Sequence, residues 1–151
     1  MDMIINPMFS SRNFSLKEIS HRPIPMDSEA LWLEACGYFQ MGIMQMIRDL
    51  ISKKFGVDVP ITPTSGYRNP TINEATPGAA KNSLHMWRIA EGMQLYCACD
   101  FTVDGSKVDP KKVYEFLVEV LGGFGELIYY PKDHHFHYSA SVKKEPFIQG
   151  G

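Results

Sequence analysis

The spacing of apolar residues changes partway along this 151-residue chain, and the change limits the folds that it can adopt. Between residues 28 and 55, apolar side chains recur every three or four positions, which is the pattern of an amphipathic α-helix. From residue 95 onward, most apolar segments are short and bounded by turn residues, as strands are. Helices followed by strands favour an α+β fold, in which helices pack on a small antiparallel sheet.

Local signals predict where the elements begin and end. Ser15 and Glu18 have the spacing of a capping box, so we expect a short helix there. Gly56 fits the end of the long helix, and Gly37 or Gly42 is the expected position of a break within it. The other predicted elements are an edge strand at 57–62, a loop at 69–82, a strand at 95–103, a helix at 111–121, and two strands at 126–130 and 136–142 joined by a tight connection.

Composition is that of a globular domain. Apolar residues make up 44% of the chain, so a single domain over residues 1–151, with 1–13 as an N-terminal extension, can bury a core without disulfides. The three cysteines, Cys36, Cys97 and Cys99, give no disulfide framework, and we expect them to be reduced.

Charge and hydropathy argue against two classes of partner. The net charge is −2 and basic residues are scattered, so we expect no nucleic-acid binding. No apolar run approaches the roughly 20 residues of a membrane helix, so we expect no membrane insertion. The N-terminus lacks the basic region of a secretory signal, so we expect synthesis in the cytoplasm.

Several histidines and one aspartate have the chemistry of a metal site. His135 and His137 are two positions apart in a predicted strand, so both side chains project from the same face. His85 and Asp100 add candidate ligands from separate segments. Imidazole and carboxylate suit zinc, and three protein ligands with one open position are typical of a catalytic zinc site.

Other residues offer weaker metal chemistry. Cys97 and Cys99 are a second candidate pair, because thiolate binds zinc strongly. Strand periodicity places them on the face opposite Asp100, which favours small buried apolar side chains instead. We interpret the isolated His21 as an ordinary surface or packing residue.

Five short motifs follow one another in an order that resembles one family. They are Phe14–Glu18, Ser65–Arg68, Ser83–His85, Ala98–Asp100 and His137–Ser139. Together they resemble the zinc D-Ala-D-Ala carboxypeptidase and endolysin group called peptidase M15, especially its small, often phage-encoded branch. The similarity covers about residues 14–142 and implies a fold like that of hedgehog and DD-peptidase domains.

The resemblance implies a role for particular residues. Arg68 would hold a carboxylate or carbonyl oxygen of the substrate, since a planar guanidinium can pair with both oxygens of a carboxylate. Ser83 would assist Arg68, and Tyr67 would be a further substrate-binding residue. The implied ligands of Zn²⁺ are His85, Asp100 and His137.

The general base is the least constrained role. In the family it is a carboxylate three residues before the last histidine or the first histidine of a His-x-His motif, and here position 134 is His. Strand alternation favours His135, because it shares the face of His137 whereas His134 points the opposite way. A histidine there can take a proton from water and return it to the leaving amine. Asp133 and Glu126 are alternative candidates.

The spacing of the ligands departs from the family pattern. Asp100 lies fifteen residues after His85, farther than in the family, and we expect residues 86–93 to be an insertion over the substrate groove. The insertion would influence the choice of substrate.

The resemblance implies a zinc-dependent peptidase that hydrolyses a peptide bond in the stem peptides of bacterial peptidoglycan, as a D-Ala-D-Ala carboxypeptidase or an endolysin-type endopeptidase. We expect it to act at the cell wall, which it would reach by lysis, through a holin or in a virion. The alternative is a non-catalytic wall-binding or virion structural module that retains the fold and the metal. His134 and the insertion at 86–93 are the departures that motivate this alternative.

Overall fold

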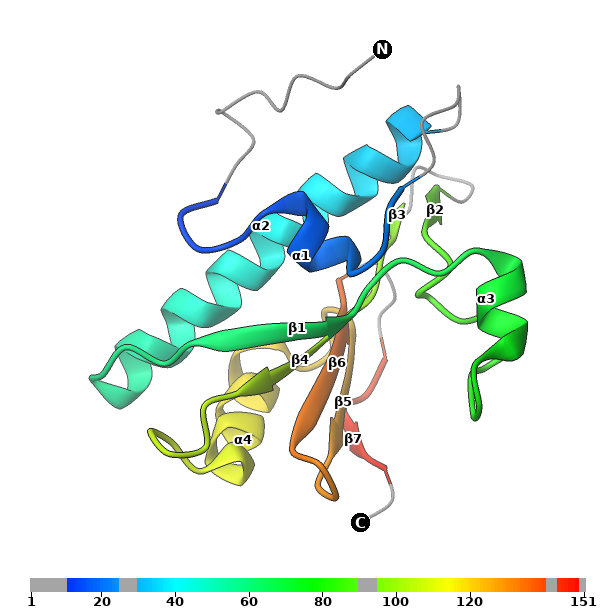
Figure 1. Cartoon of the computed structure of the whole chain (residues 1–151). Coiled ribbons are helices and arrows are strands. Elements are labelled where there is room, and N and C mark those ends of the chain that lie inside the picture. Colours follow the sequence, from blue (N-terminus) through cyan, green and yellow to red (C-terminus); the bar gives the residue numbers. More distant parts are fainter. Residues whose placement is uncertain (1–10, 25–29, 90–94, 141–143, 150–151) are drawn as a thin grey trace.

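The computed structural model describes residues 11–24, 30–89, 95–140 and 144–149 (Figure 1). A five-stranded sheet has the strand order β1-β4-β6-β5-β7, and β2 and β3 form a separate two-stranded ribbon. The elements are α1 (Leu16–Ser20), α2 (Ala30–Phe55), β1 (Ile61–Ser65), α3 (Pro70–Ala75), β2 (Arg88–Ile89), β3 (Leu95–Tyr96), β4 (Cys99–Val103), α4 (Pro110–Leu121), β5 (Glu126–Tyr130), β6 (His135–Ser139) and β7 (Phe147–Ile148). The predicted α+β class is confirmed.

The sheet is mixed rather than wholly antiparallel, which corrects one expectation. The pairs β1–β4, β4–β6 and β5–β6 are antiparallel, but β7 pairs with β5 in parallel. The missed strand β7 has only two residues, Phe147 and Ile148, too few for an alternating pattern to be recognised.

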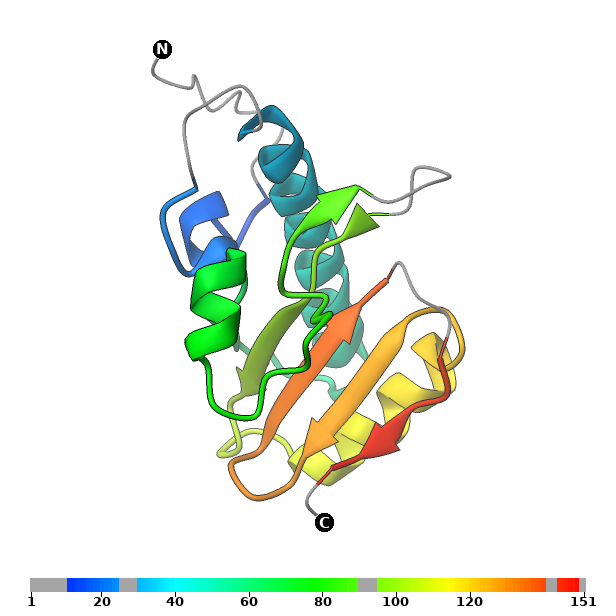
Figure 2. The ribbon, with the colours of Figure 1, turned by 90° about the vertical axis from the view of Figure 1, so that its right-hand side faces the viewer.

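The two faces of the sheet have different surroundings. Helices α2 and α4 lie behind the sheet in Figure 2, on the side where its apolar residues pack. In β6, Phe136 and Tyr138 belong to this core, so strand alternation turns His135 and His137 to the opposite face. The face away from α2 and α4 is therefore the one that carries polar side chains.

Helix α2 forms the main support of the core. Its buried residues recur at helical spacing, as at Met44, Ile47 and Ile51, and Gly56 ends it with a φ of 73°. The predicted break is wrong, because α2 runs unbroken through Gly37 and Gly42. The predicted start at residue 28 lies outside the described residues.

Gly37 has a packing role instead of a hinge role. A β-carbon at this position would lie 2.2 Å from Leu16 Cδ1 and 3.1 Å from the ring of Trp87. The glycine thus lets α1 and the segment after His85 approach α2 closely. In α1 itself, the predicted capping box of Ser15 and Glu18 is present.

A short helix, α3, replaces the loop predicted at 69–82. The Asn69 side chain accepts a hydrogen bond from the backbone of Ile72 at 2.8 Å, and Pro70 occupies the first turn. Both are helix-start signals, whereas the prediction of a loop relied on the turn-forming composition of the segment. The rest of the segment, residues 76–82, lies outside any helix or strand.

Two strands differ in position from the prediction. The edge strand expected at 57–62 is β1, and it is indeed at the edge of the sheet, but it spans 61–65. The Val59 backbone bonds instead to the Ser52 side chain of α2 at 2.9 Å. The strand expected at 95–103 is divided into β3 and β4, because Ala98 bonds through its N–H to Leu84 and through its carbonyl to Trp87.

The predicted helix at 111–121, the strand at 126–130 and its hairpin with the next strand are confirmed. The second strand, predicted at 136–142, is β6 and spans 135–139, while 141–142 lie outside the described residues. Residues 1–10 of the predicted extension at 1–13 lie outside the described residues. Within its described part, Arg12 and Asn13 bond to Asp49 and Gln45 of α2. In the part of the chain that is described, no helix has the length and hydropathy needed to span a bilayer.

Candidate metal centre

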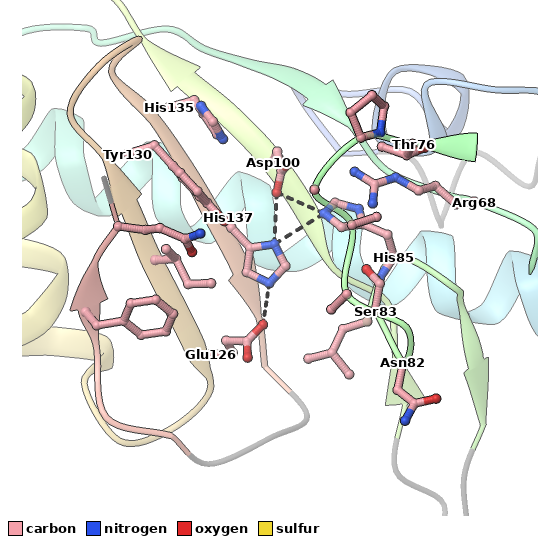
Figure 3. Close-up of a pocket in the computed structure, with 18 of the residues that line it drawn as sticks. Arg68, Thr76, Asn82, Ser83, His85, Asp100, Glu126, Tyr130, His135 and His137 are labelled. Atoms are coloured by element: carbon pink, nitrogen blue, oxygen red, sulfur yellow. Dashed lines mark hydrogen bonds and ion pairs between the residues drawn. The ribbon is translucent and has the colours of Figure 1, made fainter. Parts of the chain in front are cut away.

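Three predicted ligands converge on the polar face of the sheet (Figure 3). Asp100 of β4 and His137 of β6 are direct cross-strand neighbours, and His85 approaches from the segment before β2. Asp100 Oδ1 lies 3.0 Å from His85 Nε2 and 2.9 Å from His137 Nδ1, and the two ring nitrogens are 3.2 Å apart. Candidate ligand atoms of all three residues thus face a common point.

The orientation of His85 is set by the backbone around it. Its Nδ1 lies 2.7 Å from the carbonyl oxygen of Gly66, and its own carbonyl accepts a hydrogen bond from Arg68 N–H at 2.8 Å. The hydroxyl of Ser83 accepts a hydrogen bond from the His85 N–H at 3.2 Å. Because Gly66 accepts the Nδ1 proton, Nε2 of His85 is left to act as a ligand.

Gly66 is required by a close approach of two segments. A β-carbon there would lie 1.9 Å from the carbonyl oxygen of Ile19 and 2.8 Å from that of Ser20, at the end of α1. The next residue, Tyr67, donates its N–H to Ser20 at 2.8 Å. The end of α1 therefore positions the carbonyl that orients His85.

His137 is held between two carboxylates. Its Nδ1 faces Asp100, and its Nε2 lies 2.7 Å from Oε1 of Glu126 at the start of β5. The other oxygen of Glu126 lies 3.3 Å from Lys144 Nζ. The hydrogen bond with His137 holds the pKa of Glu126 below its usual range.

The electrostatics of the metal-free cluster are those of a buried ion pair. Burial lowers the pKa of His137, but hydrogen bonds to Asp100 and Glu126 outweigh it and raise that pKa to about 9. Burial raises the pKa of Asp100, but hydrogen bonds with His137 and His85 hold it well below its ordinary value. In the metal-free protein, the imidazolium of His137 therefore balances the negative charges of Asp100 and Glu126.

The donor set fits a metal ion. A tetrahedral site with bonds of about 2.0–2.1 Å separates neighbouring ligand atoms by about 3.3 Å, close to the separations given above. Both histidines are buried, with exposed fractions of 3% for His85 and 6% for His137. The ring nitrogen of each that would not bind metal has an acceptor, as metal-binding histidines almost always do.

A cavity of about 540 Å³ opens beside this cluster. Residues 76–80 and 82–85 form one wall, while Tyr130 of β5, His135 of β6 and residues near β7 line the remainder. In the view of Figure 3, Arg68 and Thr76 lie on one side of Asp100, and Tyr130 and His135 on the other. A ligand in the cavity can therefore touch both groups and the metal position.

Arg68 is poised to bind an acceptor. Its terminal nitrogens lie 3.4 Å from Asn73 Oδ1 and from Ser65 Oγ, which are long contacts. Its Nε is buried without a hydrogen-bond partner in the described part of the chain. Burial lowers the pKa of this guanidinium, whereas the nearby Asp100 carboxylate acts in the opposite direction. An anionic ligand in the cavity would be a stronger acceptor for the terminal nitrogens than Asn73 and Ser65 are.

The candidate bases now have distinct surroundings. His135 lines the cavity, with Nδ1 2.6 Å from Asp133 Oδ1 and its ring stacked on Tyr130 at 4.1 Å. His134 lies in the turn before β6 with a φ of 55°, and its Nδ1 contacts the Tyr129 hydroxyl at 3.2 Å. Glu126 lies across His137 from Asp100 (Figure 3). The assignment of His135 as the base stays a prediction.

Some predicted site residues lie elsewhere or act differently. The Tyr67 ring is buried against Trp87, with ring centres 5.7 Å apart, and does not line the cavity. Ser83 lines the cavity, but its hydroxyl supports the backbone of His85. Cys97 and Cys99 are buried in the core, away from the ligand group.

The described part of the segment expected to cover the groove, residues 86–89, includes contacts with α2. Trp87 donates its indole N–H to Ala98 at 3.0 Å, and Arg88 bonds to the carbonyls of Ser83 and Met86. Ribbon strand β2 packs on α2. None of the described residues among 86–93, a segment of which 90–93 are not described, lines the cavity beside the metal cluster.

Two supporting residues were missed by reasoning from sequence. The oxygen of Gly66 that orients His85 has no signature beyond the Ser-Gly-Tyr-Arg motif. Glu126, considered only as a base, contacts His137 because Ile128 of β5 pairs with His137 and places Glu126 two residues away on the same face. The register of the predicted hairpin could have revealed that contact.

Fold and site together define a protein in which two histidines and one aspartate that could hold a metal ion lie in an open cavity on one face of a mixed sheet. The sequence model of the family described as Peptidase M15 matches residues 17–139, so the chain belongs to the peptidase M15 family. Family membership assigns the protein to the metallopeptidases, a class of hydrolases. Comparison with curated proteins and with solved structures gave no significant match.

Proposed function

We propose that the protein is a zinc-dependent peptidase that hydrolyses a peptide bond in the stem peptides of bacterial peptidoglycan. The observation that carries the proposal is the convergence of His85, Asp100 and His137 beside a cavity that also contains Arg68, in a chain of the peptidase M15 family. The class of substrate comes from the family and the identity of the metal from the ligand chemistry.

The ligands favour zinc in a catalytic role. Two imidazole nitrogens and one carboxylate oxygen suit Zn²⁺, and three protein ligands leave a coordination position for water or substrate. Bound zinc would polarise the scissile carbonyl and make a water molecule more acidic.

Arg68 would anchor the substrate. Its terminal nitrogens make only long contacts and can pair with a carboxylate or carbonyl oxygen of a stem peptide. The cavity places this guanidinium on the His85 side of the cluster (Figure 3), so that a peptide anchored there would extend across the metal position.

His135 would transfer the proton. Asp133 accepts the Nδ1–H of His135, so Nε2 can take a proton from the attacking water. The same proton would pass to the amine nitrogen as the carbon–nitrogen bond breaks, which completes hydrolysis without any other reactant. Tyr130, stacked on the ring, would restrict its rotation.

In this proposal the protein is made in the cytoplasm and acts on the cell wall after lysis, after release through a holin or from a virion, by analogy with wall-degrading members of the family. The reaction products distinguish two activities. A carboxypeptidase releases a terminal residue, whereas an endopeptidase cuts an internal bond.

The test is mass spectrometry of purified peptidoglycan after incubation with the zinc-loaded protein, with a chelated sample in parallel. We expect peptide or amino-acid products that disappear with chelator and with Asp100→Ala, while Asp104→Ala, an aspartate outside the cavity, retains them. If several wall chemistries yield no products from folded, zinc-loaded protein, the proposal fails. Co-sedimentation with the same walls would then favour the non-catalytic binding module.

A further inference from the structure

The ring of His137 is bonded at both of its nitrogens. Nδ1 faces Asp100 Oδ1 at 2.9 Å, and Nε2 faces Glu126 Oε1 at 2.7 Å. A neutral imidazole carries one N–H and one lone pair, and an ionised carboxylate can only accept. In the metal-free protein the imidazolium of His137 donates to both carboxylates. When a metal replaces the proton on Nδ1, the Glu126 contact would keep the remaining proton on Nε2 and leave the lone pair of Nδ1 directed at the metal position.

His85 has the opposite arrangement. Its Nδ1 donates to the Gly66 carbonyl at 2.7 Å, so its Nε2 lone pair is the one directed at the cluster. The two candidate ligands would thus bind a metal in different tautomers. The main chain holds His85, whereas a side chain holds His137, so a point substitution can test only the second arrangement directly.

Glu126 is itself held in place on both sides. It begins β5, whose neighbours are β6 and β7, and its side chain is 16% exposed. Lys144 Nζ contacts its second oxygen at 3.3 Å and also lies 5.3 Å from the ring centre of Phe147 in β7. Because Lys144 is about half exposed, we expect its contribution to be much smaller than that of the Glu126–His137 contact.

We propose that Glu126 is a positioning residue that fixes the tautomer and orientation of His137, so that Nδ1 binds the metal. Glu126 touches the ring from the side opposite Asp100, and it would act through His137 rather than on the substrate (Figure 3). A carboxylate partner also makes a metal-binding imidazole more basic. The inference rests on the metal ligation in the proposed function but not on the choice of substrate.

The test is the metal affinity of the full-length protein, measured by competition with a chromophoric chelator for Zn²⁺. We expect Glu126→Ala to weaken zinc binding by about 10- to 100-fold. Glu126→Gln, whose amide oxygen can still accept from Nε2–H but carries no charge, should fall between Glu126→Ala and the unchanged protein. Glu119→Ala, an exposed glutamate on α4, is the matched control and should bind zinc as the unchanged protein does.

A spectroscopic measurement separates positioning from general stability. The visible absorption of bound Co²⁺ reports the ligand field, and we expect it to change in Glu126→Ala at saturating Co²⁺ and to recover in Glu126→Gln. Circular dichroism melting of the metal-free variants controls for folding. If Glu126→Ala does not fold, Glu126→Leu takes its place, because leucine also cannot accept from Nε2–H. Zinc affinity and a Co²⁺ spectrum like those of the unchanged protein in a folded Glu126→Leu variant would overturn the proposal.

The outcomes also separate this inference from the proposed activity. Tight zinc binding by Glu126→Ala overturns the role of Glu126, whatever happens to peptidoglycan. If the unchanged protein binds zinc but releases no peptide, the proposed activity fails, and a weakened Glu126→Ala still supports the positioning role. If the unchanged protein binds no metal at all, the ligand assignment and the role of Glu126 fail together.

Discussion

Asp133 Oδ1 lies 2.6 Å from His135 Nδ1, in the connection that leads into β6. The carboxylate accepts the Nδ1 proton, so the nitrogen available for proton exchange is Nε2, on a side chain that lines the cavity. Asp133 thus orients His135 beside the cavity, as a third group orients the general base in many hydrolases. It separates the role of His135 from that of His137, two residues further along the same strand.

The first prediction concerns the base. His135→Ala should lower kcat on a wall-derived peptide by about 10²- to 10⁴-fold, while leaving zinc affinity within about 2-fold. Asp133→Asn should cost much less, because Asp133 is largely exposed. Steady-state kinetics and chelator competition provide the two measurements. His134→Ala is the variant that distinguishes the two histidines. If His134→Ala lowers kcat more than His135→Ala does, the base is His134 and not His135.

The second prediction concerns the anchor of the substrate. Arg68→Ala should lower kcat/KM by about 10- to 100-fold, the size expected for the loss of a charge-assisted pair. Arg68→Lys should recover little of this, because an ammonium lacks the planar fork. Arg48→Ala is the control, since Arg48 pairs with Asp58 outside the cavity.

Substrate chemistry sharpens that test. If Arg68 binds a terminal carboxylate, a peptide whose C-terminus is amidated should lose most of its kcat/KM with the unchanged protein and should lose little more with Arg68→Ala. Equal effects of Arg68→Ala on the free acid and on the amide would instead assign the guanidinium to a carbonyl oxygen. If Arg68→Ala changes kcat/KM by less than about 2-fold on both the free acid and the amide, Arg68 does not take part in substrate binding.

Much of the site could be predicted because strands have a simple geometry. Residues two apart share a face, and this was enough to group His135 with His137 and to separate Cys99 from Asp100. The position of Tyr67 was not predictable in this way. Its neighbours Gly66 and Arg68 serve the site, but the ring turns into the core against Trp87, a contact between segments that no local pattern contains.

The elements that were missed are short or bound by tertiary contacts. The start signals of α3 were visible at Asn69 and Pro70, but six residues give too little periodicity to outweigh the turn-forming composition around them. The division between β3 and β4 depends on bonds from Ala98 to Leu84 and Trp87. Such bonds override strand propensity because they depend on the assembled fold.

The third prediction tests the glycine behind His85. Gly66→Ala should destabilise the protein by about 1–3 kcal/mol, because the added carbon would overlap the Ile19 carbonyl oxygen. It should also weaken zinc binding, since the displaced Gly66 oxygen no longer orients His85. Thermal melting and chelator competition measure the two effects. Gly42→Ala is the matched control, because nothing lies within 4 Å of its added carbon and alanine favours a helix by about 1 kcal/mol.

The fourth prediction concerns pH and metal removal. In the metal-free protein, His137 has a pKa raised from 6.5 to about 9. A raised pKa means that the folded state binds the proton more tightly than the unfolded state, so this stabilisation is fully present below pH 6.5 and is lost as the pH rises through 9. The lowered pKa of Asp100 has the opposite sign, and its stabilisation is lost only as the pH falls below the ordinary carboxylate range.

The stability that zinc contributes depends on pH in the opposite direction to the stability that the His137 proton contributes. The metal must replace the proton on Nδ1 of His137, so metal binding releases a proton and strengthens as the pH rises from 6.5 towards 9. We therefore expect the melting temperature of the chelated protein to fall between pH 6.5 and 9, and the increase in melting temperature caused by zinc to grow over the same interval. Differences taken against His137→Asn cancel the other titrating groups. A zinc-induced increase that is independent of pH in this window, with no proton release in calorimetry, would mean that His137 does not exchange its proton for the metal.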